Sequence, residues 1–225
     1  PLVDFSRPRE RGIIAVELDE GDFLVGVAIT DGKHDVMLFS DAGKAVRFEE
    51  GDVRPMGRTA RGVRGMRLGE GQRVVSMVVA SEETQSVLTA TENGFGKRTP
   101  VAEYTRHGRG TQGMNAIQAS DRNGKLISAV LVDDKDELML VSTGGILIRT
   151  KVSQIREMGR STQGVRLIDL DEGTRLAGIE RVAETEEPNG ENGNGTNGTN
   201  GDHGDIISDV PPPVEGEGGG EGEKS

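Results

Sequence analysis

Short apolar and β-branched runs, separated by Gly, Asn and Asp, follow one another along most of the chain. This pattern is typical of strands and hairpins. Residues 74–80 form an apolar run that contains one serine, Ser76, and residues 86–91 and 95–99 flank the turn Glu92-Asn93-Gly94. An Asn-Gly pair suits a primed hairpin turn, which needs positive φ. No apolar stripe of helical period exceeds two turns, so the pattern predicts an all-β fold.

Comparable runs lie on both sides of this stretch. The further strands predicted are residues 13–18, 23–29, 36–40, 44–48, 63–68, 116–119, 126–132, 137–142 and 146–150. Runs such as 74–80 lack alternation, which predicts burial on both faces between neighbouring blades. The strand 44–48 alternates, which predicts Val46 and Phe48 inward and Arg47 outward.

The chain repeats itself every 51 residues. Gly62, Gly113 and Gly164 are 51 apart, within loops that all contain a Gly-Arg pair. Four short strands per unit of about 50 residues predicts blades arranged radially, as in propellers. The expected units are residues 1–50, 51–100, 101–150 and 151–183, with the last one incomplete. Three and a half blades would leave open strand edges, which predicts further blades upstream of Pro1.

Charge divides the chain into two parts. The net charge is −11, but residues 184–225 hold eleven acidic residues and one lysine, so residues 1–183 carry only −1. The acidic part also holds eleven glycines. This composition predicts a disordered tail that cannot form a core. It is either a solubilising tail or a polyanion that competes with a nucleic acid for basic side chains; both interpretations stay open.

Neither composition nor motifs indicate an enzyme. With no cysteine, disulfides and thiolate metal sites are excluded, and a reducing cytoplasm fits best. No apolar run reaches the ~20 residues that cross a bilayer. The three histidines occupy unrelated positions, and no zinc-protease, P-loop or nucleophile-elbow motif occurs. Tyr104, the only tyrosine, is expected to serve packing or to lie at the surface. We therefore predict no catalytic residue, no metal and no cofactor in this segment.

The basic residues follow the repeat. Arg58, Arg109 and Arg160 share the 51-residue register, and so do Arg47, Arg98 and Arg149. A radial array would place such residues along one curved rim. The candidate DNA-binding residues are Arg47, Arg54, Arg58, Arg61, Arg64, Arg67, Lys97, Arg98, Arg106, Arg109, Arg149, Lys151, Arg156, Arg160 and Arg166.

A basic rim of this kind suits the phosphate backbone of duplex DNA. The arginine fork pairs with phosphate oxygens, and Gly-rich loops let backbone N–H groups approach closely. Nothing in the pattern suits base reading, since there is no recognition helix and only 3% of residues are aromatic. Binding driven by charge and shape would bend the duplex, at a cost of roughly 1–6 kcal/mol for 20–30 bp. Merely solvated surface arginines are the alternative.

Three long segments resemble the carboxy-terminal domain family of the DNA gyrase A subunit: residues 36–48, 62–71 and 89–99. The resemblance extends over about residues 1–183. It implies a six-bladed β-pinwheel, a propeller-like fold of which this chain would hold a partial ring, about the last four blades. It also implies that DNA wraps around the domain in support of ATP-dependent negative supercoiling by a type IIA topoisomerase.

The resemblance further implies the partners. These would be double-stranded DNA, and the gyrase B subunit and the rest of the gyrase A subunit in a heterotetramer. The assembly would lie in the cytoplasm, on the nucleoid. ATP and Mg²⁺ would act in other parts of that enzyme, and no membrane or small-molecule substrate is expected. The family's Gln-Arg-Arg-Gly-Gly-Lys-Gly box is absent here, so this segment alone is not expected to support supercoiling. The equivalent domain of topoisomerase IV and a protein-binding propeller are the alternatives.

Overall fold

The computed structural model describes residues 1–182, so the predicted acidic tail lies outside the described residues. Four 3-10 helices of three or four residues occur here, and no described helix is long and apolar enough to span a bilayer. They are η1 (Leu2–Phe5), η2 (Glu50–Asp52), η3 (Val101–Glu103) and η4 (Val152–Gln154). The strands are β1 (Asp35–Ser40), β2 (Lys44–Glu49), β3 (Val74–Ala80), β4 (Ser86–Thr91), β5 (Phe95–Pro100), β6 (Met114–Asn115), β7 (Leu126–Val132), β8 (Glu137–Ser142), β9 (Leu147–Lys151), β10 (Val165–Arg166) and β11 (Leu176–Val182).

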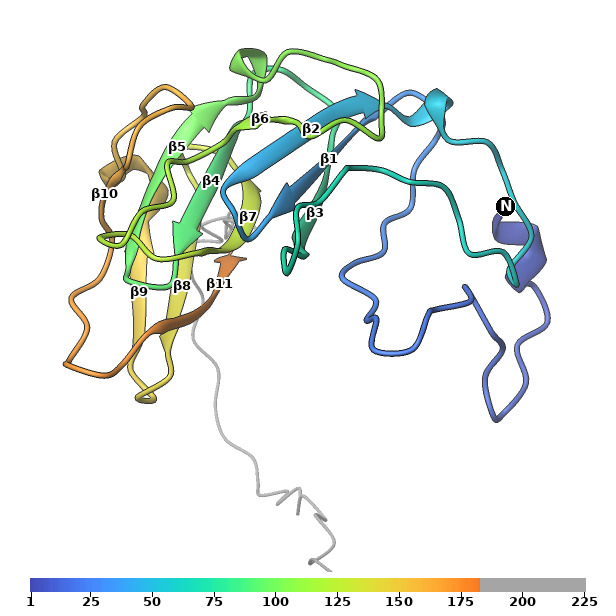
Figure 1. The fold of residues 1–225 in the computed structure, drawn as a ribbon, viewed down its shortest axis with the longest axis horizontal. Helices are drawn as coiled ribbons and strands as arrows, with labels where there is room; N and C mark the ends of the chain where they lie inside the picture. Colours follow the sequence, from blue (N-terminus) through green and yellow to red (C-terminus); the bar gives the residue numbers. More distant parts are fainter. Residues whose placement is uncertain (183–225) are drawn as a thin grey trace, which may run out of the picture. The chain divides into compact units, whose positions relative to one another are not determined.

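These strands form three antiparallel sheets (Figure 1), in the orders β3-β1-β2-β6, β10-β5-β4-β7 and β11-β8-β9. Each sheet is centred on one tight hairpin: β1–β2, β4–β5 or β8–β9. The third strand comes from further along the chain, and in the first two sheets a two-residue fourth strand comes from further still. We expected four consecutive strands per blade. Only the hairpins have turns short enough to force neighbouring strands to pair, so the other strands pair across repeats.

The 51-residue repeat is confirmed. The hairpins begin at residues 35, 86 and 137, and the short helices that follow them begin at 50, 101 and 152. The bounds predicted for residues 74–80, 86–91, 126–132 and 137–142 are those observed, and those of the remaining hairpin strands differ by at most one residue at either end. An all-β architecture is therefore what these residues form.

Four predicted strands are wrong. Residues 13–18, 23–29, 63–68 and 116–119 form no strand. Residues 23–29 are the counterparts of β3, which pairs with the hairpin of the repeat before it. Among residues 1–182 no hairpin lies beside this segment to form a ladder with it, and Phe23 is 82% exposed.

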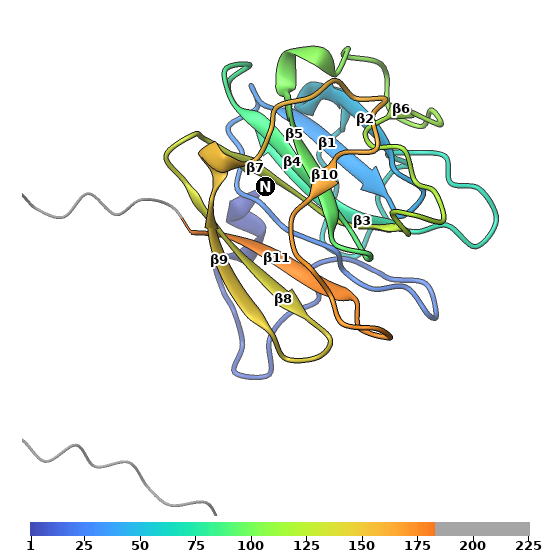
Figure 2. The ribbon, with the colours of Figure 1, turned by 90° about the vertical axis from the view of Figure 1, so that its left-hand side faces the viewer.

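Burial also differs from the prediction. The fully buried strand is β4, whose six residues are all buried, whereas five of the seven residues of β3 are only half-buried. β4 lies between β5 and β7 in its sheet and is covered from both sides, while β3 is an edge strand. The sheets meet through their third strands, because β7 contacts both β3 and β11 (Figure 2). Tyr104 packs in this interior, edge-on to Phe39 at 6.1 Å between ring centroids.

Candidate nucleic-acid interface

Arg47 faces the interior, so the prediction that it points outward is wrong. Arg47 is 4% exposed, and its guanidinium lies 2.6 Å from a carboxylate oxygen of Asp35 and 2.9 Å from one of Glu83. It also donates to the carbonyl oxygens of Val101 and Tyr104, at 2.9 and 3.0 Å. With its donors committed to a buried network, Arg47 joins two repeats and presents no charge to a partner.

Lys97 and Arg98 are committed in the same way. Lys97 is fully buried, and its ammonium group donates to the carbonyl oxygens of Gly159 and Arg160, the latter at 2.6 Å. Burial lowers the pKa of Lys97 to about 8, against an opposing contribution from Glu103. Arg98 donates to the carbonyl oxygen of Ile155 at 2.7 Å and pairs with Asp134. These side chains brace the loop that leads to Arg160.

Four of the candidates are exposed but paired with carboxylates. Arg61 pairs with Asp19 at 2.7 Å and with Glu17 at 3.3 Å, and Arg106 pairs with Asp35 at 3.0 Å and Glu49 at 2.8 Å. The hydrogen bond to Asp35 raises the pKa of Arg106, so its charge is fixed at any ordinary pH. Arg149 pairs with Glu137, and Arg166 pairs with Asp169. Surface pairs of this kind open at little cost, so these cations are only partly neutralised.

The remaining eight candidates make no ion pair with a described residue. All are exposed or half-buried, and they come from three successive Gly-Arg loops and the strands beside them. They are Arg54, Arg58, Arg64, Arg67, Arg109, Lys151, Arg156 and Arg160.

Three of these eight repeat one contact. Arg58 donates to the carbonyl oxygen of Ile14 at 2.7 Å, Arg109 to that of Arg64 at 3.2 Å, and Arg160 to that of Asn115 at 3.3 Å. The acceptors also recur, 50 and 51 residues apart, so each arginine is held by the equivalent carbonyl of the preceding repeat. Arg58 and Arg160 each commit one of five N–H donors to this bond, and Arg109 also donates to the backbone carbonyl oxygen of Asp52 at 3.0 Å. Three guanidinium groups thus lie at intervals set by the repeat, and each has at least three N–H donors that no residue of 1–182 accepts.

Sequence reasoning missed Arg122. Its guanidinium stacks on the ring of Phe95, 4.3 Å from the centroid, while Arg166 approaches the same ring at 5.5 Å. Two cations beside one ring form a small basic patch held by cation–π contacts. No signal in the sequence marked Arg122, because glycines occupy the equivalent positions 71 and 173.

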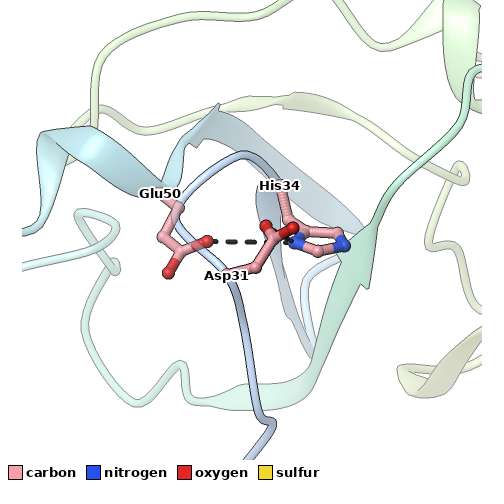
Figure 3. A group of neighbouring side chains, drawn as sticks. All are labelled: Asp31, His34 and Glu50. Carbon is pink, nitrogen blue, oxygen red and sulfur yellow. Dashed lines mark ion pairs between the residues drawn. The ribbon is translucent and has the colours of Figure 1, made fainter. Parts of the chain in front are cut away.

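One histidine and two carboxylates form the group that comes nearest to a metal centre among the described residues. The Nδ1 atom of His34 lies 2.9 Å from Asp31 and 4.0 Å from Glu50 (Figure 3). Glu50 already accepts hydrogen bonds from the N–H of Gly32 at 2.9 Å and from the hydroxyl of Thr30. These hydrogen bonds hold the loop before β1 against η2.

Four successive segments match the family model for the DNA gyrase C-terminal domain, beta-propeller: residues 1–31, 34–81, 85–133 and 136–183. The last three segments begin 51 residues apart, in the register of the hairpins. The chain belongs to this family. Each matched unit from residue 34 onward holds one hairpin and the third strand of its sheet, as the sheets are built.

Similar proteins agree with this family. The chain is 55% identical over 190 residues to the DNA gyrase A subunit of Pseudomonas aeruginosa, covering 84% of the chain and 20% of that protein. It is 50% identical over 183 residues to the corresponding protein of Escherichia coli K12, covering 81% and 21%. The chain thus spans about a fifth of the length of these curated relatives.

Two solved structures have a similar fold. A DNA gyrase A C-terminal domain superposes with a TM-score of 0.71 at 28% identity, covering 77% of this chain and 59% of the other. The C-terminal domain of a DNA topoisomerase IV gives 0.76 at 27% identity, covering 80% and 57%. The expected pinwheel, a propeller-like fold, is therefore confirmed.

Proposed function

We propose that this domain binds double-stranded DNA without sequence preference and bends it, as the carboxy-terminal part of a gyrase A subunit. The cations of successive Gly-Arg loops contact successive stretches of the phosphate backbone. In the whole enzyme, this domain acts together with the rest of the gyrase A subunit and with the gyrase B subunit. The bent duplex is used there for ATP-dependent negative supercoiling, on the nucleoid in the cytoplasm.

The observation that carries the proposal is the series Arg58, Arg109 and Arg160. The three side chains repeat with the fold, each is anchored on a carbonyl of the preceding repeat, and each keeps free donors. Hydrogen bonds between the strands set the spacing of these three charges. The side chains can therefore contact phosphates without rearranging, which lowers the entropic cost of binding. The proposal leaves out Arg47, Lys97 and Arg98, whose donors bind carbonyl oxygens inside the protein.

The test compares two triple variants. Arg58, Arg109 and Arg160 are changed to alanine in one, and the ion-paired Arg61, Arg149 and Arg166 in the other, so that the net charge falls equally. Bending is measured by energy transfer between dyes at the two ends of a short duplex. We expect the first variant to lose bending and at least about tenfold in affinity, at roughly 1 kcal/mol or less per lost contact. Equal losses in both variants would mean that only net charge matters.

The topoisomerase IV domain is the second candidate, because it superposes on this chain as well as the gyrase domain does. Two assays on an enzyme carrying this domain separate them. A gyrase introduces negative supercoils into relaxed DNA in the presence of ATP. An enzyme that only relaxes or unlinks DNA would mean that the domain supports the activity of a topoisomerase IV instead.

A further inference from the structure

Strands β6 and β10 occupy equivalent places in the first two sheets, next to the residue that follows each hairpin turn. Asn115 of β6 lies opposite Lys44, and Arg166 of β10 lies opposite Phe95. Both residues of the short strands are exposed, and they are 51 positions apart, as Lys44 and Phe95 are. Each short strand therefore defines a site: the β6 site, with Asn115 and Lys44, and the β10 site, with Arg166 and Phe95.

At the β6 site two cations from different repeats contact one neutral residue. The ammonium group of Lys44 donates to the side-chain oxygen of Asn115 at 2.6 Å, and the guanidinium of Arg160 donates to its backbone carbonyl oxygen at 3.3 Å. Neither cation pairs with a carboxylate of residues 1–182. Like charges held on one residue repel each other, and an anion that binds both removes this repulsion.

The β10 site has its cations on other residues. Phe95 stands there in place of Lys44, and Arg166 in place of Asn115. The guanidinium of Arg122 lies 4.3 Å from the centroid of the Phe95 ring, and that of Arg166 lies 5.5 Å from it. A cation–π contact of this kind orients a guanidinium and leaves its N–H groups available to a ligand. Two positive charges are therefore present at this site as well.

Arg122 also contacts the Gly-Arg loop of the last repeat. Its guanidinium donates to the side-chain oxygen of Gln163 at 2.9 Å, and the neighbouring Asn123 donates to the backbone carbonyl oxygen of Gln163 at 2.7 Å. Gln163 lies three residues after Arg160 in the same loop. Arg122 is thus held beside the loop that carries one of the three anchored arginines.

The carbonyl anchors of the arginine series lead to the β10 site too. Ile14, Arg64 and Asn115 supply the three acceptors, and the next residue in the 51-residue register is Arg166. At this fourth place, positive charge comes from the guanidinium groups of Arg122 and Arg166 themselves. A cation is therefore present at each interval of the series.

We propose that Lys44 and Arg122 bind phosphate groups of the duplex, as the partners of Arg160 at the β6 site and of Arg166 at the β10 site. The inference rests on the proposed function, because it adds two cations to the same DNA interface. Arginine offers a phosphate group a planar fork and lysine offers it a compact charge, so each pair of cations suits the phosphate backbone. Neither Lys44 nor Arg122 belongs to a basic series of the repeat, because their counterparts are apolar residues or glycines.

The salt dependence of DNA binding tests these contacts. Lys44→Met and Arg122→Met are combined in the 225-residue chain, and Lys33→Met and Lys135→Met are combined in a control. Both variants lose two positive charges, and the control residues are exposed and lie just before β1 and β8, at the ends of the hairpins away from the turns. For a short duplex of mixed sequence, we expect the slope of log K against log[salt] to become shallower by about 2 in the first variant and by less than about 0.5 in the control.

Crosslinking locates the contacts independently of charge, because single cysteines can be introduced into a chain that has none. Lys44→Cys, Arg122→Cys, Lys33→Cys and Lys135→Cys are each labelled with a short photoactivated crosslinker and irradiated with the duplex. We expect positions 44 and 122 to crosslink at least about fivefold more than positions 33 and 135, since the yield follows the local concentration of DNA.

Two kinds of failure are distinguishable. An unchanged chain without salt-dependent affinity for the duplex would overturn the proposed function and this inference together. If the unchanged chain binds, a slope that changes equally in the two variants, or crosslinks no more frequent at 44 and 122 than at 33 and 135, would place Lys44 and Arg122 outside the interface and overturn this inference alone.

Discussion

Arg47 shows how a surface-type residue becomes part of a core. Its guanidinium bridges Asp35 and Glu83 and reaches two carbonyl oxygens of a loop that starts more than 50 residues later. Removing one partner of a buried pair leaves the other charge uncompensated, which costs about 3–5 kcal/mol. Asp35 keeps a second partner in Arg106, so the cost at this site falls at the lower end.

Arg47→Gln is therefore expected to lower the free energy of unfolding by about 3 kcal/mol, measured by urea denaturation at pH 7. Arg54→Gln is the control, since Arg54 is exposed and makes no ion pair with a described residue, and its change should stay within about 0.5 kcal/mol. A variant at position 47 as stable as the control would contradict a structural role for Arg47.

Lys97 predicts a pH dependence. Its pKa is lowered to about 8 by burial, from 10.5 in the unfolded chain. Between these two values the unfolded state binds more protons than the folded state, so the contribution of Lys97 to stability rises with pH. Below pH 8 both states are protonated, and the burial cost is constant.

Comparing the protein with Lys97→Met isolates this contribution, because all other groups titrate in both. From pH 7.5 to 10.5 the stability of the protein should rise relative to the variant, by up to about 3 kcal/mol. The measurement is urea unfolding at several pH values. A stability difference that does not change with pH, or that falls, would mean that Lys97 keeps an ordinary pKa.

For single residues, the sequence predicted which arginines recur with the repeat but not whether their side chains face the interior or the solvent. Arg47 and Arg58 both belong to 51-residue series, yet one is buried and the other lies at the surface. The difference comes from Asp35, Glu83 and the loop after β5, which the fold brings to Arg47 from other strands. A period in the sequence carries no information about such partners.

Among the elements, the fourth strands depend on close backbone approach. Gly43 has φ +73°, and a Cβ there would lie 2.4 Å from the carbonyl oxygen of Ile117. Gly71 has a similar φ of +69° but nothing within 4 Å of its Cβ position. The two glycines thus share a left-handed backbone conformation, and only Gly43 has a neighbouring segment close to its Cβ position.

Gly71→Ala should cost about 1 kcal/mol of stability from the left-handed conformation alone. Gly43→Ala should cost about 3 kcal/mol, because a backbone carbonyl must also move. Amide hydrogen exchange should show the loss around residues 114–117 in the second variant only. Equal costs at both positions would mean that β6 contributes little to the sheet.

Hairpins were predictable and the remaining pairings were not. The strands of each hairpin are joined by a tight turn such as Glu92-Asn93-Gly94, so the local sequence sets both their bounds and their partners. The run 23–29 has the same apolar pattern as β3, but strand formation there requires a hairpin from a preceding repeat. The repeat period and the composition indicate which segments can form strands. Whether such a segment pairs depends on a partner strand that is distant in the sequence.

Across the whole molecule, pairing between repeats does more than close sheets. β3 is joined to β1 and β6 to β2, so a single sheet holds segments from residue 35 to residue 115. Consecutive repeats are therefore connected by backbone hydrogen bonds as well as by side-chain packing. This rigid linkage is what keeps Arg58, Arg109 and Arg160 at fixed intervals, and it was not evident from the repeat alone.

The salt dependence of DNA binding measures how many of these cations meet phosphates. Each neutralised phosphate contributes about −0.9 to the slope of log K against log[salt] on duplex DNA. If all eight candidate residues that make no ion pair with a described residue contact phosphates, the slope is roughly −7. Between 50 and 200 mM salt, six to ten contacts would lower affinity about 10³–10⁵-fold.

Replacing Arg58, Arg109 and Arg160 by alanine should make the slope shallower by about 3. Replacing Arg61, Arg149 and Arg166 should change the slope less, because their carboxylate partners already neutralise part of the charge. A slope near zero would indicate a propeller that binds protein instead of DNA, and a full slope in the first variant would place the contacts elsewhere on the domain.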